Sequence, residues 1–398
     1  MGTSNGTTQK IRTMSSPLKY IPALDGLRGI AILWVMLHNG ILDYFLPNDT
    51  ALEKIFIAFV NAGWLGVQLF FVLSGYLITR ILLQPNSQSP SRTLKKFYTR
   101  RVLRIFPIYY AFLAFALIFS IIDWPPLAWS TPIKEHIIWI ALHLTNWIQV
   151  DTDLGVGHLW SLAVEEQFYL VWPLIVIFFS RQTVKTICVL SIPAAIAFRL
   201  WFFNTSTDPE IASLGAYILT PARIDALLIG ALLAELTLCP QQAAKIRTHL
   251  RTLFVVSAGL IIAISATHFS FSKVGSGITS INQSIAAICF ACLIYFLTID
   301  NQRWAMKTTI LRVLNSRLLT NVGKHSYAMY IVHSPISLTL HSYYSTSQIW
   351  GEIGNDSFLR SLALITDLLL LFALTYLFAR ITWVLIEKPC LKLKHRFD

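Results

Sequence analysis

The sequence has little charge for its length and few cysteines. Only 13% of its 398 residues are Asp, Glu, Lys or Arg, whereas a soluble domain usually carries about 25%. The five cysteines are odd in number, and four of them lie in or beside apolar segments. Cys289 and Cys292 form a Cys-x-x-Cys pattern inside an apolar stretch, which favours packing over redox or metal chemistry. A soluble fold and a metal site are therefore not expected.

Long apolar stretches are what the sequence has instead. Hydrophobic residues make up 55% of the chain, and the mean hydropathy is +0.59. Stretches of roughly 18 apolar residues recur between short polar loops, as in helices that span a bilayer. We predict an all-α polytopic membrane protein with about ten transmembrane helices. The expected spans cover residues 29–46, 63–83, 105–122, 160–180, 186–203, 219–238, 253–271, 281–299, 323–343 and 361–385.

The basic residues are unevenly distributed between the loops. With both termini in the cytoplasm, the cytoplasmic segments contain 24 Lys and Arg, whereas the external segments contain only Lys54, Lys134, Lys273 and Arg360. This asymmetry follows the positive-inside rule and predicts an N-in, C-in, multi-pass protein of the plasma (inner) membrane. The net charge of +12 is explained by this orientation, so nucleic acid is not an expected partner.

One further apolar stretch, residues 137–148, does not fit an even number of crossings. If it crossed, the loop with Arg181 and Lys185 would face outward and every later loop would reverse. We expect a re-entrant or interfacial segment on the outer side. The first 19 residues lack the apolar core and cleavage site of a signal peptide. The expected division is a cytoplasmic tail at 1–20, a transmembrane domain at 21–386 and a cytoplasmic tail at 387–398.

Few ionisable residues fall inside the expected spans, where charge is costly and usually marks function. Those that we single out as candidates are His38, Glu165, Glu166, Arg199, Arg223, Asp225, His333 and Asp367. All are expected near mid-membrane or in the outer half, and one outward-open cavity is the simplest arrangement. Structural alternatives stay open. Arg223 and Asp225 could anchor helix ends, Arg199 could pair with Asp367, and His333 could donate to a carbonyl.

The inner side carries a cluster of cations before the third expected span. Residues 80–104 contain seven Lys and Arg and no carboxylate. Arg100 and Arg104 are four residues apart and therefore share one face of a helix. Anchoring by the positive-inside rule is one explanation. The sharper hypothesis is a site for a polyphosphate such as the nucleotide end of coenzyme A.

Seven segments, in order along nearly the whole chain, resemble motifs of the membrane-bound acyltransferase-3 family, the O-antigen and peptidoglycan O-acetylase type. They are LDGLRGIAILWVMLHN at 24–39, GVQLFFVLSGYLI at 66–78, Arg100-x-x-x-Arg104, HLWSLAVEEQFYLVWPL at 158–174, TPARIDALLIGALLA at 220–234, SYAMYIVHSPI at 326–336 and the terminal Glu387-Lys388-Pro389. Each motif is moderately specific, but their common order makes the resemblance strong.

The resemblance implies an O-acyltransferase that moves an acyl group, usually acetyl, from cytoplasmic acyl-CoA to a hydroxyl of an extracytoplasmic glycan or lipid-linked saccharide. Acyl-CoA is then a co-substrate, with no bound cofactor and no metal, and membrane lipids surround the enzyme. The stand-alone type, without an appended hydrolase-like domain, is expected. The implied catalytic residues are His38, Arg28 and Glu165 or Glu166; the implied donor-binding residues are Arg100, Arg101 and Arg104; the substrate cavity would include Ser74, His158, Arg223, Asp225 and His333.

One spacing departs from the family pattern. Nine residues separate Arg28 from His38, where the family usually has ten, and the usual histidine position is Asn39. At 100° per residue, a ten-residue step misses the starting direction by about 80°. Either the helix begins after Arg28, or it is locally irregular, or Arg28 does not meet His38.

The implied reaction needs a base that removes the proton of the acceptor hydroxyl. A neutral imidazole at His38 suits this role, and a carboxylate such as Glu165 could orient it. Transfer through an acyl-enzyme on His38 or Ser74 is an open alternative, although Ser74 also suits plain helix packing. A secondary transporter that uses the same intramembrane charges, and a non-catalytic partner in glycan assembly, are the competing functions.

Overall fold

The computed structural model describes residues 20–41, 51–84, 88–122, 125–238, 240–268, 277–300, 305–343 and 357–396. These residues form helices and connecting turns, with no β-strand among them. The long helices are α1 (Pro22–Ile41), α3 (Trp64–Leu82), α4 (Pro90–Ile122), α7 (Trp160–Phe178), α8 (Arg181–Thr205), α10 (Thr220–Leu236), α12 (Arg247–His268), α13 (Gly277–Thr298), α15 (Arg317–Tyr343) and α17 (Ser357–Thr382). The shorter elements are α2 (Ala51–Asn61), α5 (Ile133–Ala141), α6 (Thr145–Ile148), α9 (Pro209–Ile218), α11 (Pro240–Lys245), α14 (Ala305–Leu314), α18 (Lys388–Lys392), η1 (Pro125–Ser130), η2 (Gly157–Leu159), the π-helical η3 (Trp383–Glu387) and η4 (Leu393–Arg396).

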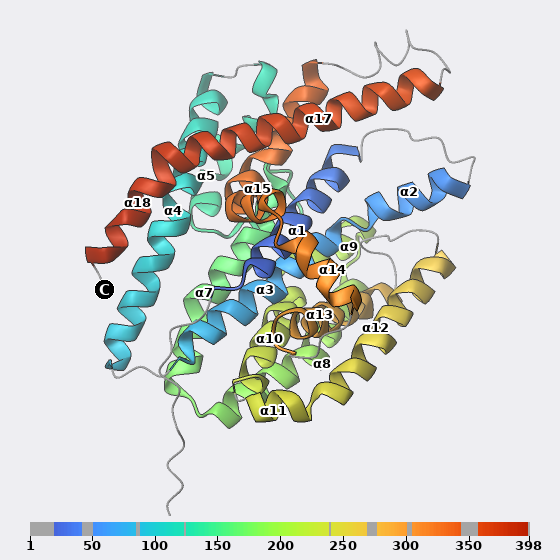
Figure 1. The fold of residues 1–398 in the computed structure, drawn as a ribbon. Helices are drawn as coiled ribbons and strands as arrows, with labels where there is room; N and C mark the ends of the chain where they lie inside the picture. The colour runs from blue at the N-terminus through green and yellow to red at the C-terminus, as the bar shows by residue number, and fades with distance from the viewer. Residues whose placement is uncertain are drawn as a thin grey trace, which may run out of the picture.

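The helices pack as one bundle, which confirms the all-α class. In Figure 1, α1, α3, α7, α10 and α15 lie in the interior, while α4, α12 and α17 run along its outside. Seven helical segments of the described chain are long and apolar enough to cross a membrane. They are Lys54–Leu82, Pro90–Ile122, Gly157–Phe178, Arg181–Thr205, Pro209–Leu236, Ser280–Thr298 and Leu364–Lys392. The chain is thus a multi-pass membrane protein.

The ten predicted spans each overlap one of the long helices. By the criterion of length and composition, α1, α12 and α15 are not among the seven candidate crossings. Parts of two predicted spans, residues 42–46 and 269–271, lie outside the described residues. The first span is also displaced, because α1 begins at Pro22 and not near residue 29.

Glycines allow α3 and α10 to approach each other closely. A Cβ added at Gly75 would overlap the carbonyl of Leu227, and one added at Gly230 would overlap the carbonyl of Val72. Small residues at helix crossings are the usual means of close packing between membrane helices. The crossing holds in place the helices that carry Ser74 and Arg223, both of which the sequence identified as candidates.

The apolar stretch at 137–148 forms no single long helix. It is divided between α5 and α6 by a turn at His143, whose φ is 55°. The hydroxyl of Tyr109 donates to the carbonyl of Ile140 at 2.6 Å and attaches α5 to α4. Burial lowers the pKa of His143 to about 4, so its ring is neutral at pH 7. A broken segment of this length is too short to cross a bilayer.

Candidate active site

Three cavities lie in series through the interior of the bundle. The largest, here called the histidine cavity, has a volume of 610 Å³. Its polar walls come from α1, the 149–160 segment, α9 and α15. They include His38, Asn39, Gln149, Asp153, His158, Tyr217, Tyr330 and Ser334.

The second cavity, here called the glutamate cavity, adjoins the first. It is only 80 Å³ in volume, and Val67 and Tyr330 line both cavities. Its polar residues are Arg28, Ser74, Arg101, Arg104, Ser161, Glu165, Tyr169, Ser326 and Tyr327. In this cavity, cations of α1 and α4 therefore surround one carboxylate of α7.

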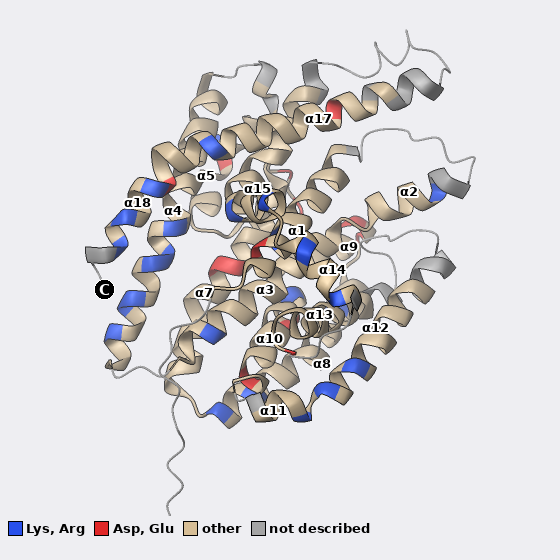
Figure 2. Ribbon diagram, in the orientation of Figure 1, with Lys and Arg blue, Asp and Glu red and all other residues tan. Residues whose placement is uncertain are grey.

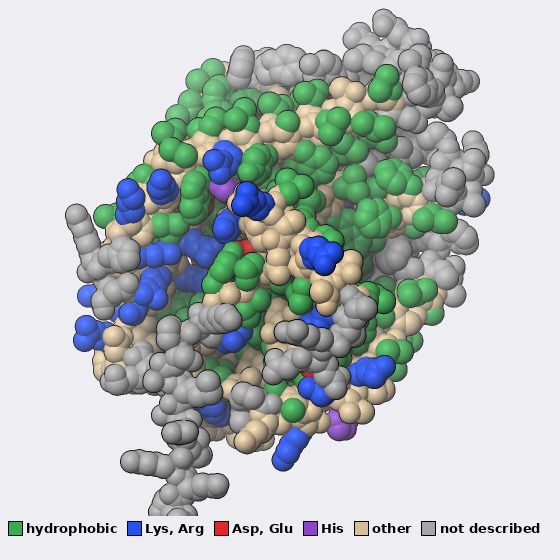
Figure 3. Space-filling model, viewed as in Figure 1, with side chains coloured by type: hydrophobic (Ala, Val, Ile, Leu, Met, Phe, Trp, Pro, Cys, Tyr) green, Lys and Arg blue, Asp and Glu red, His purple; other side chains and the backbone are tan. Residues whose placement is uncertain are grey.

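The third cavity, here called the basic cavity, has a volume of 400 Å³. It shares Arg101 and Arg104 with the glutamate cavity and adds Lys96, Arg100 and Lys394. Lys and Arg follow one another along α4 and α18 in Figure 2, and they border a hollow in the surface in Figure 3. This concentration of cations suits a ligand with several phosphates.

His38 is held by a backbone carbonyl. The side chain is 4% exposed, and its Nδ1 lies 3.0 Å from the carbonyl oxygen of Val60. A carbonyl only accepts, so Nδ1 carries the proton and Nε2 is the basic nitrogen of the ring. Gly63 packs directly against His38, because a Cβ at Gly63 would overlap the His38 Cβ and lie 2.7 Å from the carbonyl oxygen of Trp34.

Two further imidazoles lie near His38, and of these His158 lines the histidine cavity. His333 accepts from the Asn39 amide at Nε2, at 2.8 Å, and donates from Nδ1 to the carbonyl of Tyr330 at 2.7 Å. His158 donates from Nε2 to the carbonyl of Ile331 at 2.9 Å. The rings of His158 and His333 are 5.2 Å apart between centroids. The hydrogen bond to His333 fixes the orientation of Asn39, which follows His38 in α1.

Glu165 contacts Ser74 and not His38. The Ser74 hydroxyl donates to Oε1 of Glu165 at 2.7 Å, and both residues line the glutamate cavity. The idea that Glu165 orients the imidazole is therefore wrong in this structure, because Nδ1 of His38 is occupied by Val60. Glu166, the next residue of α7, is half-buried and is not a lining residue of the three cavities.

A known protein family matches the part of the chain that forms these helices. A family model described as an acyltransferase domain matches residues 21–384, which span all three cavities except Lys394. The chain belongs to this acyltransferase family. No solved structure matches the chain.

The relatives of this acyltransferase chain are O-acetyltransferases by name. O-acetyltransferase OatA of Staphylococcus aureus strain NCTC 8325 / PS 47 is 29% identical over 360 residues, which is 86% of this chain and 54% of OatA. SACOL0978 of Staphylococcus aureus strain COL, provisionally named an O-acetyltransferase, is 27% identical over 376 residues, 85% of this chain and 54% of the relative. The chain spans about half the length of these relatives.

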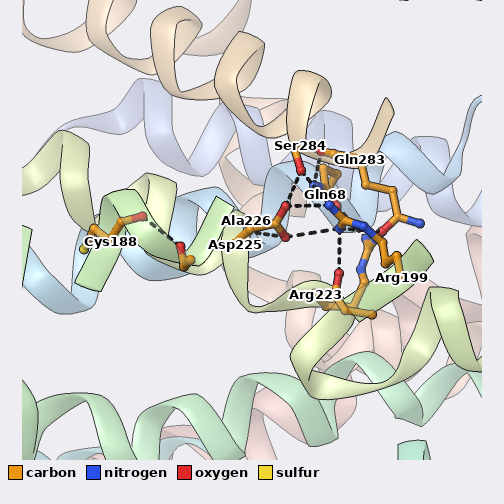
Figure 4. Close-up of polar contacts among 10 residues, drawn as sticks. Gln68, Cys188, Arg199, Arg223, Asp225, Ala226, Gln283 and Ser284 are labelled. Carbon is orange, nitrogen blue, oxygen red and sulfur yellow. Dashed lines mark hydrogen bonds and ion pairs between the residues drawn. The ribbon is translucent and has the colours of Figure 1, made fainter. Parts of the chain in front are cut away.

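Arg223 and Asp225 of the acyltransferase chain do not line the three cavities, contrary to the prediction. Asp225 is paired with Arg199 at 3.1 Å and accepts from Ser284 at 2.5 Å (Figure 4). Arg223 donates to Gln68 at 2.5 Å, and its guanidinium lies 4.9 to 5.5 Å from the centres of three aromatic rings. These rings belong to Phe71, Trp160 and Tyr217, which are cavity walls. Arg223 thus packs against residues that form the cavity walls and does not line a cavity itself.

Three other predictions also need correction. Arg199 pairs with Asp225 and not with Asp367. His333 is fully buried behind Asn39 and is not itself a lining residue. The intramembrane charged groups do not share one cavity, because His38 lines one cavity, Glu165 lines the next, and Arg199 and Asp225 form a separate buried pair.

The spacing of Arg28 and His38 is resolved by α1. The helix begins at Pro22, before Arg28, so a late helix start is excluded. Within one continuous helix the two side chains point about 80° apart, and they line different cavities. Arg28 lies 3.6 Å from Asp25 and faces Arg101 and Arg104 across the glutamate cavity.

Sequence reasoning missed the residues that join the cavities. Tyr330 lines both the histidine and the glutamate cavities, and its hydroxyl is 2.5 Å from the Ser161 hydroxyl. Val67 is the second shared wall. Both lie inside quoted motifs, but nothing in a lone tyrosine or valine of an apolar helix indicates that it separates two cavities.

Proposed function

We propose that this chain is a membrane-embedded O-acyltransferase that moves an acetyl group from cytoplasmic acetyl-CoA to a hydroxyl of an extracytoplasmic saccharide. In this proposal it has ten transmembrane helices with both termini in the cytoplasm, in the plasma membrane. The single observation that carries the proposal is the series of three cavities, since it connects a cationic site for phosphates to a site with a basic imidazole.

The donor enters from the basic cavity. Arg100, Lys96 and Lys394 bind the phosphates of acetyl-CoA, because guanidinium and ammonium groups pair strongly with phosphate oxygens. The narrow pantetheine arm then passes Arg101 and Arg104 into the glutamate cavity. This cavity is 80 Å³ in volume, which suits a slender arm and a short acyl group better than a folded nucleotide.

The chemical step takes place where the glutamate and histidine cavities meet. Nε2 of His38 accepts the proton of the acceptor hydroxyl as the oxygen attacks the thioester carbonyl carbon. The C–O bond forms, the C–S bond breaks, and the coenzyme A thiolate leaves toward the cations of α4. The proton on His38 then passes to the thiolate or to water. An acyl-enzyme on Ser74 or His38 would divide the same transfer into two steps.

The proposal is tested with the full chain in sealed vesicles, with acetyl-CoA on the side of the basic cavity. We expect consumption of acetyl-CoA that depends on an added envelope saccharide, and saccharide that gains one acetyl group by mass. His38→Ala should lower the transfer rate at least about a hundredfold, because general-base catalysis typically contributes that much. Uptake of saccharide without acetyl-CoA consumption would overturn the proposal in favour of a transporter.

A second variant tests the donor end of the same pathway. Lys96→Gln removes one phosphate-binding cation of the basic cavity and should raise KM for acetyl-CoA while leaving KM for acetyl-pantetheine, which lacks the nucleotide, unchanged. Arg92→Gln is the matched control, because Arg92 is an exposed cation of α4 outside the cavity. Equal effects of Lys96→Gln on both donors would contradict the assignment of the phosphate site.

A further inference from the structure

An apolar groove adjoins the histidine cavity at Trp129. It lies between α4, α15 and α17 and has a volume of 570 Å³. Phe115, Leu377 and Ile381 on its walls are 48 to 56% exposed. In a membrane protein such side chains face lipid, so the groove opens toward the bilayer and not toward water.

The groove offers no unsatisfied polar group to an occupant. Trp129 donates its indole N–H to the Thr339 hydroxyl at 3.0 Å, and Thr339 donates to the carbonyl of Pro335 at 2.8 Å. Thr382 donates to the carbonyl of Phe378 at 3.1 Å. The other lining side chains are hydrocarbon. A sugar or phosphate would lose hydration there without new partners, so the occupant is a hydrocarbon chain.

Trp129 is a wall that the groove and the histidine cavity share. It lines both, and it is fixed between the Thr339 hydroxyl and the stacked ring of Phe112, whose centroid is 6.1 Å away. The outer half of α15 forms the rest of the partition. Leu338 lines the histidine cavity, whereas the adjacent Thr339 lines the groove. A molecule that bends around the Trp129 side chain would have its polar head in the histidine cavity and its tail in the groove.

The groove is long enough for an extended hydrocarbon chain. Leu374 and Ile386 both line the groove and are twelve residues apart, about 18 Å at 1.5 Å per residue. A hydrocarbon tail is narrow enough to follow it.

We infer that the groove binds the hydrocarbon tail of a lipid-linked saccharide whose sugar occupies the histidine cavity. This inference rests on the proposed function and names its acceptor class. The acceptor reaches the enzyme laterally from the bilayer, with its tail along α17 and its sugar on the far side of Trp129. The tail anchors the acceptor, and His38 acts on the hydroxyl presented to it.

Ala111 provides the test, because it is an exposed residue of α4 on the groove wall. Ala111→Trp fills the groove. Ala197→Trp on α8 is the matched control, since Ala197 is also exposed but lies outside the groove. Each full-length variant is extracted with its surrounding native membrane in polymer discs. Its lipids are then identified by mass spectrometry, and saccharide-bearing lipids are compared with bulk phospholipid.

We expect saccharide-bearing lipids to be enriched with the wild type and with Ala197→Trp. Ala111→Trp should lower the enrichment about tenfold, the loss that removing the contacts of a few methylene groups produces. Equal enrichment in Ala111→Trp, or bulk phospholipid alone in the wild type, would overturn the inference. The unfolding temperature of each variant and a milder Ala111→Leu change separate groove filling from misfolding.

The outcome is also distinct from that of the proposed function. Wild-type protein that turns over acetyl-CoA with a saccharide acceptor but binds no saccharide-bearing lipid overturns the groove assignment alone. Wild-type protein that binds such a lipid but transfers no acetyl group overturns the enzyme assignment and leaves a lipid-binding groove.

Discussion

The side chain of His38, the proposed base, is tightly packed. One contact sets its tautomer, the 3.0 Å hydrogen bond to Val60, and one glycine sets its position. Gly63 begins the turn from α2 into α3 and presents no side chain to the imidazole. A base that must meet both a hydroxyl and a thioester benefits from such tight placement, because small displacements of reacting groups are costly.

Gly63→Ala is expected to impair transfer. The new Cβ would overlap His38 Cβ, so the imidazole must shift, and the rate should fall about a hundredfold. Initial rates of acetyl-CoA consumption measure the effect. Gly259→Ala is the control, since no atom lies within 4 Å of the Cβ it adds. A normal rate for Gly63→Ala would show that the ring tolerates displacement.

Arg28 illustrates what spacing alone can predict at a single residue. Because Arg28 and His38 are ten residues apart, helix geometry already separates their directions by about 80°. The structure selects among the alternatives, since α1 is continuous from Pro22 and the two side chains line different cavities. Arg28 thus belongs with the cations Arg101 and Arg104 of the glutamate cavity.

At the scale of helices, a buried ion pair joins α8 to α10. Arg199 and Asp225 have side chains that are 0% and 1% exposed, and the pair is completed by Gln283 and Ser284 of α13. Side chains of α8, α10 and α13 are therefore joined by hydrogen bonds here, as Figure 4 shows. Two charges so deep in a membrane protein are compensated by their ion pair and by these hydrogen bonds.

Asp225→Asn is expected to destabilise the bundle by about 3–5 kcal/mol, because it leaves the guanidinium of Arg199 buried without its carboxylate. Unfolding of the purified protein in detergent measures this loss. Asp208→Asn is the control, since Asp208 is exposed and an asparagine also caps α9. The double change Arg199→Met with Asp225→Leu should recover much of the stability. If Asp225→Asn unfolds like the wild type, the pair is dispensable.

At the scale of the whole molecule, the distribution of charge and the order of the cavities indicate the same orientation in the membrane. The basic cavity draws on α4 and the C-terminal segment, both of which the distribution of Lys and Arg assigns to the cytoplasm. The histidine cavity lies beyond the glutamate cavity, beside the residues 149–160 that the same rule assigns to the outside. In the proposed reaction, a donor from the cytoplasm and an acceptor from outside would then meet between these two cavities.

Labelling of single cysteines tests this orientation. On a background without the five native cysteines, Lys134→Cys should react with an impermeant thiol reagent in intact cells. Arg181→Cys should react only after permeabilisation, because the positive-inside rule places it in the cytoplasm. Both positions are exposed, so access to the reagent is matched. The reverse pattern would invert the molecule and separate the basic cavity from cytoplasmic acyl-CoA.

Sequence alone determined the elements and the chemistry that are local in the chain. Apolar length predicts helices because lipid cannot satisfy backbone polar groups, and the cations at Arg100 and Arg104 share a helix face because of their spacing. Tertiary structure decided what depends on neighbours distant in sequence. Val60 and not Glu165 contacts His38, and Asp225 and not Asp367 pairs with Arg199. Burial and partners arise only when helices pack, so no pattern within one helix could specify them.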